Sequence, residues 1–321
     1  MMSSLSLTGS QMEDAHQYLS EFVQPTPLLN LSNYDGGKEN QIHLKVESLL
    51  PTGSFKVRAA QYALQQHYSE INDQGVWTVS AGNMGKALAW CASQKRVPCT
   101  VVVPDDAPLV KVQAIRRYGA NIIEVSFQEY QDIQINGKFP TLRGKLIHPF
   151  ADPPVIAADA TIAWEILEAQ PDLEVIFVPY GGGGLTLGVA QAAHAFNPQI
   201  HVIPCEVETA TPLTSSLAAG KPVLVDYTPS FISGIGAPFI FPQMWLEVQR
   251  WVNETCVVTL AEVCQAMRWL SEEHHLIVEG AGAVSLAAAL KNRHRFHKSA
   301  CILTGGNIDW NVFLKVMIKD I

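Results

Sequence analysis

The sequence predicts an α/β protein in which parallel strands lie buried between helices, and three observations lead to this prediction. Short apolar, β-branched segments alternate with longer segments of helical periodicity. The chain of 321 residues is long for a single hydrophobic core, so one large domain or two closely joined domains are expected. A hydrophobic content of 48% with 16% charged residues is typical of a well-buried globular enzyme.

The alternation of strand-like and helix-like segments runs through most of the chain. The expected strands are residues 43–47, 76–79, 99–103, 121–125, 175–178, 201–205 and 300–303. The expected helices are residues 56–66, 85–94, 109–118, 157–168, 185–195, 260–274 and 283–292. Proline-rich connectors at 25–27 and 149–154 are candidate boundaries. The second connector is expected to return the chain from a small domain, 46–150, to a large domain formed by 1–45 and 151–321.

Composition and charge exclude several classes of function. A formal net charge of −8 disfavours nucleic acid as a partner, because phosphate binding needs clustered lysine and arginine. The sequence has no apolar run of about 18 residues to span a membrane, and residues 1–6 lack a signal-peptide pattern. The six cysteines are scattered without a CxxC pair, and several lie inside apolar runs. These features predict a cytoplasmic protein without a zinc site.

Lys56 is the first candidate for catalysis. It follows the turn Gly53-Ser54 and stands between apolar Phe55 and Val57 at the expected start of a helix. The positive end of a helix dipole and an apolar environment both favour a neutral amine, which is the form that attacks a carbonyl group to make an imine. An exposed lysine at a helix start is the ordinary alternative, and this segment by itself leaves both interpretations open.

A second polar segment, Ser80-Ala81-Gly82-Asn83, lies between an expected strand and an expected helix. Backbone N–H groups and short polar side chains at such a corner can bind an anion. The Asn83 amide can also donate a hydrogen bond to a phenolate-like oxygen. An ordinary capping turn has the same composition, so both interpretations stay open here as well.

The third segment contains four successive glycines, Gly181 to Gly184, between an apolar strand and a helix. A backbone without Cβ atoms can fold closely around a phosphate group. The segment also comes near the dinucleotide fingerprint, with Glu206 at the end of the next strand as a ribose-binding acid. A nicotinamide-dependent oxidoreductase is therefore a competing hypothesis, although the third glycine, Gly188, is displaced by one residue from the fingerprint spacing.

The fourth segment is Thr304-Gly305-Gly306-Asn307, which follows an apolar strand. The Thr304 hydroxyl can cap the following turn, or it can face the ring nitrogen of a bound heterocycle. Taken alone, the segment favours the capping role.

In this order, the four segments resemble the fold-type II pyridoxal-phosphate enzymes, and among them the branch of serine/threonine dehydratases (threonine ammonia-lyases) and serine racemases. The likeness extends over residues 26–307, nearly the whole chain, and includes the segments 104–108, 115–120 and 278–283. Four motifs in the family's order are far more specific than any one of them. The resemblance implies two open, mostly parallel sheets with helices on both faces, of the tryptophan synthase β-like type, with a small domain inserted in a larger one.

The resemblance also implies pyridoxal 5′-phosphate as the cofactor, and Lys56 and Ser80 as catalytic residues. Lys56 would bind the cofactor's aldehyde covalently, as a Schiff base. The substrate carboxylate would be bound by Ser80, Ala81, Gly82 and Asn83. The residues implied to hold the cofactor are Phe55 at the ring, Asn83 at the 3-oxygen, Thr304 at the ring nitrogen, and the backbone of Gly181, Gly182, Gly183, Gly184 and Leu185 at the phosphate. A hydroxyl at the ring nitrogen makes a weaker electron sink than a carboxylate would, which β-elimination tolerates better than transamination does.

Several departures from the family pattern bear on the reaction. Racemases typically carry a second serine in the Ser80 loop as the base on the opposite face of the substrate, so Ala81 in that place disfavours racemisation. Phe150 is also more typical of the dehydratases than of the racemases. No metal is expected, because Glu206 is retained but Pro212 stands where a further acidic ligand would lie.

Three other departures are Met84 for a histidine, Asp159 for the glutamine of a Gly-Gln-Gly segment, and Tyr180 for a valine. All three are expected to border the active site or the residues that support it. For Met84 and Tyr180, packing explains the substitution equally well.

The sequence therefore predicts a pyridoxal-phosphate-dependent ammonia-lyase that converts a β-hydroxy amino acid, such as threonine or serine, to a 2-oxo acid and ammonia by α,β-elimination. An amino-acid racemase and an enzyme of β-replacement or threonine synthase-like chemistry are the nearest alternatives. A nicotinamide-dependent oxidoreductase and a catalytically silent binding protein on the same scaffold are more distant. The family expectation is a homodimer acting on a small-molecule amino acid, with no nucleic-acid or membrane partner.

Overall fold

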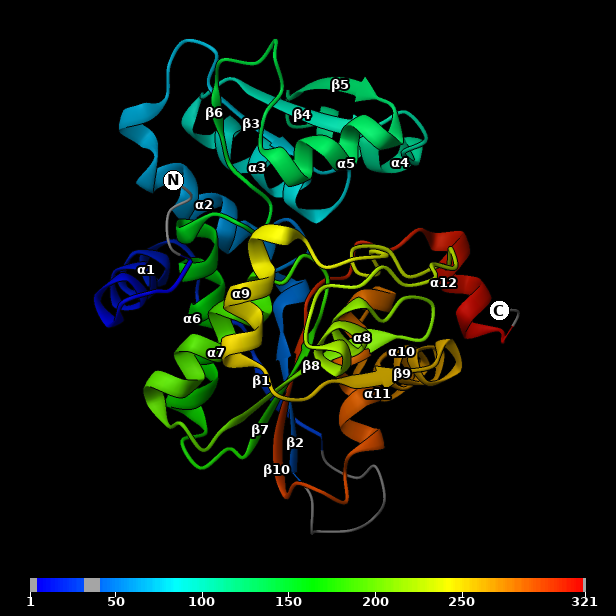
Figure 1. Cartoon of the computed structure of the whole chain (residues 1–321). Helices are drawn as coiled ribbons and strands as arrows, with labels where there is room; N and C mark the ends of the chain where they lie inside the picture. Colours follow the sequence, from blue (N-terminus) through cyan, green and yellow to red (C-terminus); the bar gives the residue numbers. More distant parts are fainter. Residues whose placement is uncertain (1–4, 32–40, 320–321) are drawn as a thin grey trace.

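The computed structural model describes residues 5–31 and 41–319, which form two separate sheets (Figure 1). The larger sheet has the strand order β1 (Leu28–Asn30), β2 (Gln41–Val46), β10 (Lys298–Leu303), β7 (Val175–Pro179), β8 (His201–Val207), β9 (Cys256–Val258). The smaller sheet has the order β5 (Asn121–Val125), β4 (Cys99–Pro104), β3 (Val76–Val79), β6 (Lys145–Leu146). Every strand pair is parallel except β1 with β2, which confirms the predicted fold class.

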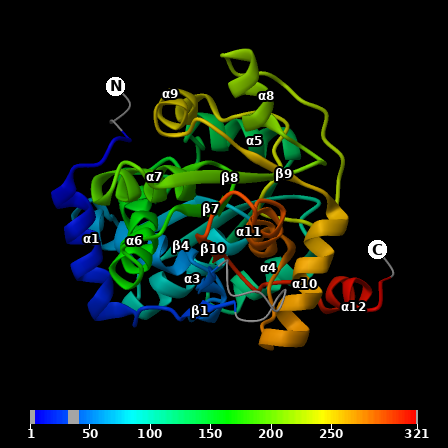
Figure 2. The same ribbon diagram turned by 90° about the horizontal axis from the view of Figure 1, so that it is seen from below.

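Helices cover both faces of the larger sheet (Figure 2). On one face lie α7 (Gly184–Phe196), α6 (Pro153–Ala169) and α1 (Gly9–Phe22), and on the other α11 (Gly280–Lys291), α10 (Leu260–His274) and α12 (Trp310–Met317). Because both faces of the sheet are covered, successive side chains of strand β10 point to opposite faces and are buried in two different cores. Cys301 and Leu303 join the core formed with α10 and α11, whereas Ala300 and Ile302 join the core formed with α6 and α7.

The smaller sheet is covered in the same way. One face packs on α2 (Lys56–Gln66), α3 (Asn83–Lys95) and α4 (Leu109–Arg116), and the other on α5 (Phe127–Asn136). In β4, Val101 and Val103 join the first core and Val102 the second. The remaining elements are the short helices η1 (Glu47–Leu49) and η2 (Tyr68–Glu70), with α8 (Pro212–Ala219) and α9 (Pro242–Trp251).

The smaller sheet lies inside residues 46–150, the range predicted for a small domain. Its core nevertheless includes residues of α1 and α6, so the two parts share packed surface. Residues 1–4, 32–40 and 320–321 of the predicted large domain lie outside the described residues. Over the ranges that the structure describes, no helix combines the length and the apolar character needed to cross a membrane.

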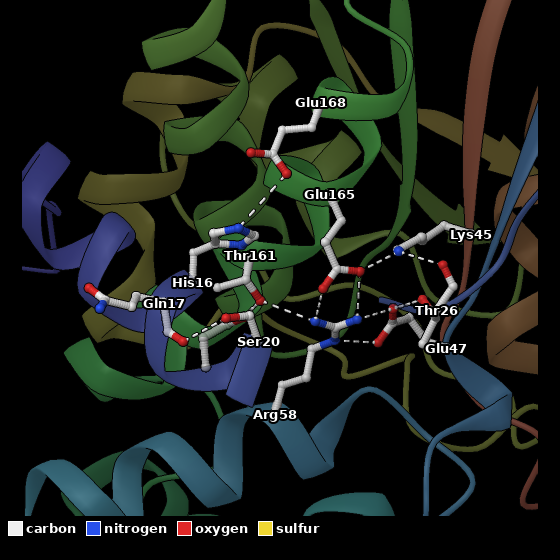
Figure 3. A network of polar contacts seen from close by, with 11 residues as sticks. His16, Gln17, Ser20, Thr26, Lys45, Glu47, Arg58, Thr161, Glu165 and Glu168 are labelled. Atoms are coloured by element: carbon white, nitrogen blue, oxygen red, sulfur yellow. Dashed lines mark hydrogen bonds and ion pairs between the residues drawn. The ribbon is translucent and has the colours of Figure 1, made fainter. Parts of the chain in front are cut away.

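A buried network of charged side chains joins η1, α2, α6 and β2 (Figure 3). Arg58 donates to Glu47 at 2.8 and 3.0 Å and to Glu165 at 2.9 Å, and Lys45 donates to Glu165 as well. Lys45 also donates to the carbonyl oxygen of Thr26 at 2.9 Å. Burial alone would raise the pKa of Glu165, but Arg58 and Lys45 together lower it below its ordinary value. Two cations thus balance two carboxylates in the interior.

We expect the substitution Arg58→Met to destabilise the fold by about 3–5 kcal/mol, because it leaves two buried carboxylates facing one cation. The free energy of unfolding from urea denaturation measures this. Arg116→Met is the matched control, since Arg116 pairs with Glu124 at 3.4 Å and the two side chains are 51% and 55% exposed. It should change stability by about 0–1 kcal/mol. Equal losses in both variants would contradict this account of the network.

Candidate active site

The loop that carries Lys56 is anchored to the segment after β10. The backbone N–H of Phe55 donates to the carbonyl oxygen of Thr304 at 3.0 Å, and the N–H of Gly306 donates to the carbonyl oxygen of Gly53 at 2.9 Å. Two segments that are far apart in the sequence therefore meet at the carboxyl end of the larger sheet. This pairing brings Lys56 and Thr304, both predicted site residues, to one place.

Lys56 is the first residue of α2, and its side chain is only 14% exposed. Its Nζ donates to the carbonyl oxygen of Pro149 at 2.7 Å and lies 4.6 Å from the centroid of the Phe55 ring. Burial lowers the pKa of this amine, and the carboxylate of Asp159, with Oδ2 at 4.0 Å from Nζ, offsets the effect only in part. The environment therefore favours the neutral amine, in agreement with the sequence analysis.

The segment Ser80–Asn83 forms the corner between β3 and α3. The N–H of Gly82 donates to the Ser80 hydroxyl at 3.3 Å. Asn83 is the first residue of α3; its amide donates to Glu279 Oε1 at 2.6 Å and accepts a hydrogen bond from Asn307 at 2.8 Å. These contacts join the Asn83 loop to the segment after β10, and so to the loop of Lys56.

Glu279 is a site residue that the sequence analysis missed. It is the N-cap residue of α11 and is buried. Burial raises the pKa of its carboxyl group to about 7, although Asn83, Lys111 and Lys86 act in the opposite direction. In the sequence it is an acidic residue before a run of glycine and alanine, inside the segment 278–283 that shares in the family resemblance. Nothing in that pattern indicates pairing with Asn83, which lies 196 residues earlier.

The four glycines form the entry to α7. Gly183 is the N-cap residue, with φ of +93°, a conformation that favours glycine. A Cβ atom at Gly182 would lie 2.3 Å from the Phe150 ring, and one at Gly184 would lie 2.6 Å from the Phe150 carbonyl oxygen. Phe150 directly follows Pro149, whose carbonyl oxygen accepts the Lys56 hydrogen bond. The glycine loop and Lys56 therefore contact adjacent residues of the same connector.

The residues present at this place fit pyridoxal 5′-phosphate. The first N–H groups of a helix have no partner inside the helix, and no side chain caps the start of α7. The hydroxyl of Thr186 is buried there without a hydrogen-bond partner among the described residues. Gly181 and Leu185 complete the loop. An anion such as a phosphate would satisfy these donors, and an amine suited to an aldehyde lies nearby at Lys56.

The departures from the family pattern separate into two kinds. Met84 and Tyr180 are 2% and 3% exposed and pack in hydrophobic clusters, and the Tyr180 hydroxyl also lies next to Gly183 of the glycine loop. Asp159 in contrast faces Lys56. Ala81 is partly buried.

The carboxylate of Glu206 is engaged by the start of α8. It accepts hydrogen bonds from the N–H of Leu213 at 2.7 Å, the N–H of Thr214 at 2.8 Å and the Thr214 hydroxyl at 2.6 Å. These bonds occupy both of its oxygens. The nicotinamide hypothesis thereby loses its ribose-binding acid.

Comparison with known proteins identifies the family. The family described as "Pyridoxal-phosphate dependent enzyme" matches residues 19–305. L-threonine ammonia-lyase of Thermotoga maritima is 35% identical over 321 residues, covering 98% of this chain and 79% of that protein. L-threo-3-hydroxyaspartate ammonia-lyase of Saccharomyces cerevisiae is 32% identical and covers 94% of each chain. The solved structure of maize serine racemase has a TM-score of 0.85 at 31% identity, over 97% of each chain. The chain therefore belongs to the pyridoxal-phosphate-dependent enzymes, and pyridoxal 5′-phosphate is its cofactor, as the sequence predicts.

Proposed function

We propose that this enzyme is an ammonia-lyase that converts a β-hydroxy amino acid to a 2-oxo acid and ammonia. The observation that carries the proposal is the buried amine of Lys56, whose pKa is lowered. The connector Pro149-Phe150 contacts both this amine and the uncapped start of α7. The relatives named above support the reaction class, because threonine and 3-hydroxyaspartate are both β-hydroxy amino acids.

In this proposal each motif contacts one part of the cofactor. The backbone of Gly181 to Leu185 binds the phosphate, Phe55 lies against the ring, Asn83 binds the 3-oxygen and Thr304 faces the ring nitrogen. When bound, pyridoxal 5′-phosphate supplies an electron sink for the α-carbon of the substrate.

The chain's own residues position the substrate and move a proton. The Ser80–Asn83 segment binds the substrate carboxylate through hydroxyl and N–H groups at the start of α3. The Lys56 amine accepts the α-proton of the substrate, which its lowered pKa permits. The bond between the β-carbon and the hydroxyl oxygen then breaks, and the hydroxyl takes up a proton and leaves as water. Burial of the site limits competing reactions with solvent.

A racemase is the second candidate, favoured by the similarity to serine racemases. Racemisation needs a base on each face of the substrate, and Ala81 has no proton to exchange. We therefore place elimination first.

The site is proposed to lie between a small domain, 46–150, and a large domain of residues 1–45 and 151–321. We further propose a cytoplasmic homodimer. All six cysteines are free and buried, which suits a reducing compartment. Light scattering of the purified enzyme distinguishes a dimer from a monomer.

The first test is an absorption spectrum of the purified enzyme, followed by an assay for 2-oxo acid with a panel of β-hydroxy amino acids. We expect visible absorbance from the bound cofactor, fixed to Lys56 by borohydride, and 2-oxo acid from at least one member of the panel. Bound cofactor without any 2-oxo acid would redirect the assignment to racemisation or β-replacement.

We expect Lys56→Ala to abolish both the imine absorbance of the cofactor and turnover, because it removes the amine that is proposed to form the imine and to accept the α-proton. Lys221→Ala, which removes an exposed lysine, is the control and should keep both. Retained turnover in Lys56→Ala would contradict the mechanism.

We expect Ala81→Ser to introduce racemase activity, because it adds a hydroxyl at the position of the second base. Chiral chromatography of recovered substrate measures it, with the wild-type enzyme as control. Substrate that stays enantiomerically pure in both would show that a hydroxyl at residue 81 is insufficient.

A further inference from the structure

Asp159 is a buried titratable group to which the proposed mechanism gives no task. It lies in the middle of α6 and is fully buried. Its Oδ2 is 4.0 Å from the Nζ of Lys56, within ion-pair distance but too far for a hydrogen bond. Neither carboxylate oxygen has a hydrogen-bond partner among the residues that the structure describes. Such a group is costly to bury unless a cation compensates it.

Helix α7 closes the other side of this position. Gly188 of α7 lies directly against the backbone of α6: a Cβ atom there would be 2.5 Å from the carbonyl oxygen of Ile156 and 2.8 Å from the N of Ala160. The two helix backbones are thus in close contact at Asp159. Its side chain is fully buried, and its Oδ2 faces the Lys56 amine.

Burial raises the pKa of the Asp159 carboxyl group to about 7; among the charged groups that act on it, Lys56 and Arg58 of α2 lower this pKa and Glu47 of η1 raises it further. The guanidinium of Arg58 already donates to Glu47 and Glu165, and Thr161 lies within reach of its last N–H group. Its charge is thus balanced within the network of Figure 3. Among the described residues, Lys56 is paired with no carboxylate other than that of Asp159.

His148, in the connector before α6, is the other titratable group beside Lys56. Its Nδ1 accepts a hydrogen bond from the N–H of Ala151 at 2.9 Å, and its Nε2 lies 2.9 Å from the carbonyl oxygen of Gln134. An accepting Nδ1 and a donating Nε2 describe the neutral imidazole, and burial lowers the pKa of His148 accordingly. His148 therefore brings no charge to Lys56.

We propose that the carboxylate of Asp159 is the counter-charge of the Lys56 nitrogen and holds the proton on it. Asp159 is then a positioning residue, which acts through Lys56 and does not touch the substrate. The inference rests on the covalent role proposed for Lys56. When the Lys56 amine takes the α-proton, the C–H bond breaks, an N–H bond forms and the electron pair stays with the carbon. The resulting ammonium arises in a buried site, and Asp159 compensates its charge.

The test is a pH titration of the visible absorbance of the cofactor bound to Lys56, in the holoenzyme. Asp159→Asn and Asp159→Gln remove the negative charge, so the Lys56 nitrogen should lose its proton at a pH lower by about one unit or more. Asp159→Glu keeps the charge and should keep the midpoint near that of the wild type. Glu168→Gln is the matched control, because it removes a carboxylate that is 56% exposed on the same helix, and it should cause no shift.

An unchanged midpoint in both amide variants would overturn the inference, even if their turnover falls, because a merely structural role does not move the titration. If neither amide variant folds, the wild type decides. The titration midpoint of the wild-type enzyme should lie above that of the adduct of pyridoxal 5′-phosphate with Nα-acetyllysine in the same buffers, because burial without a counter-charge would lower the midpoint. An equal or lower midpoint contradicts the inference. Failure of borohydride to fix the cofactor on wild-type Lys56 would instead overturn the proposed function itself.

Discussion

The packing of α2 against α6 is the constraint on which the candidate site depends. Arg58, two residues after Lys56, donates from its guanidinium to Glu47 and Glu165, and these bonds join η1, α2 and α6. Buried ion pairs of this kind contribute little net stability compared with an apolar core. Their contribution here is geometric, since they fix the start of α2 and direct the Lys56 amine toward Pro149 and α6.

The same arrangement gives neighbouring residues two different electrostatic environments. The charges of Arg58, Lys45, Glu47 and Glu165 compensate one another, so this group stays charged without affecting its surroundings strongly. Among the described residues, Lys56 faces a single carboxylate, that of Asp159 at 4.0 Å, and burial still lowers the pKa of its amine. A side chain in its charged form and an amine driven toward its neutral form thus lie two residues apart, within the first turn of α2.

Much of the fold is predictable from the sequence because its apolar periodicity is strong. The helix at Leu260–His274 is found at its predicted residues, and it begins with a capping box formed by Thr259 and Glu262. The helix at Lys56–Gln66 is also found as predicted. The sequence analysis did not predict five of the helices, namely α1, α5, α8, α9 and α12. In three of them the apolar periodicity is weak, because α1 and α5 are largely polar with few buried residues and α8 is short.

The candidate site was predictable where a glycine-containing turn marks it, as at Gly53 or Gly183. The pairs that join such turns were not, because a sequence pattern reports local geometry and says nothing of which distant segments meet. Asn83 with Glu279 and Lys56 with Asp159 are contacts of this kind, separated by 196 and 103 residues. Only the topology of the two sheets brings them together.

Stable folds pair their buried polar groups, and departures from this rule concentrate at functional sites. Glu279 follows the rule, since Asn83 donates to it and Lys86 and Lys111 oppose the effect of burial on its pKa. The hydroxyl of Thr186 and the carboxylate of Asp159 break it, because both are buried without a hydrogen bond among the described residues. One lies at the uncapped start of α7 and the other beside the Lys56 amine. Glu279 is therefore explained by its hydrogen bond to Asn83. Other buried groups, among them His43 and Trp251, also lack a partner among the described residues, but for Thr186 and Asp159 the proposed phosphate and the Lys56 nitrogen would supply one.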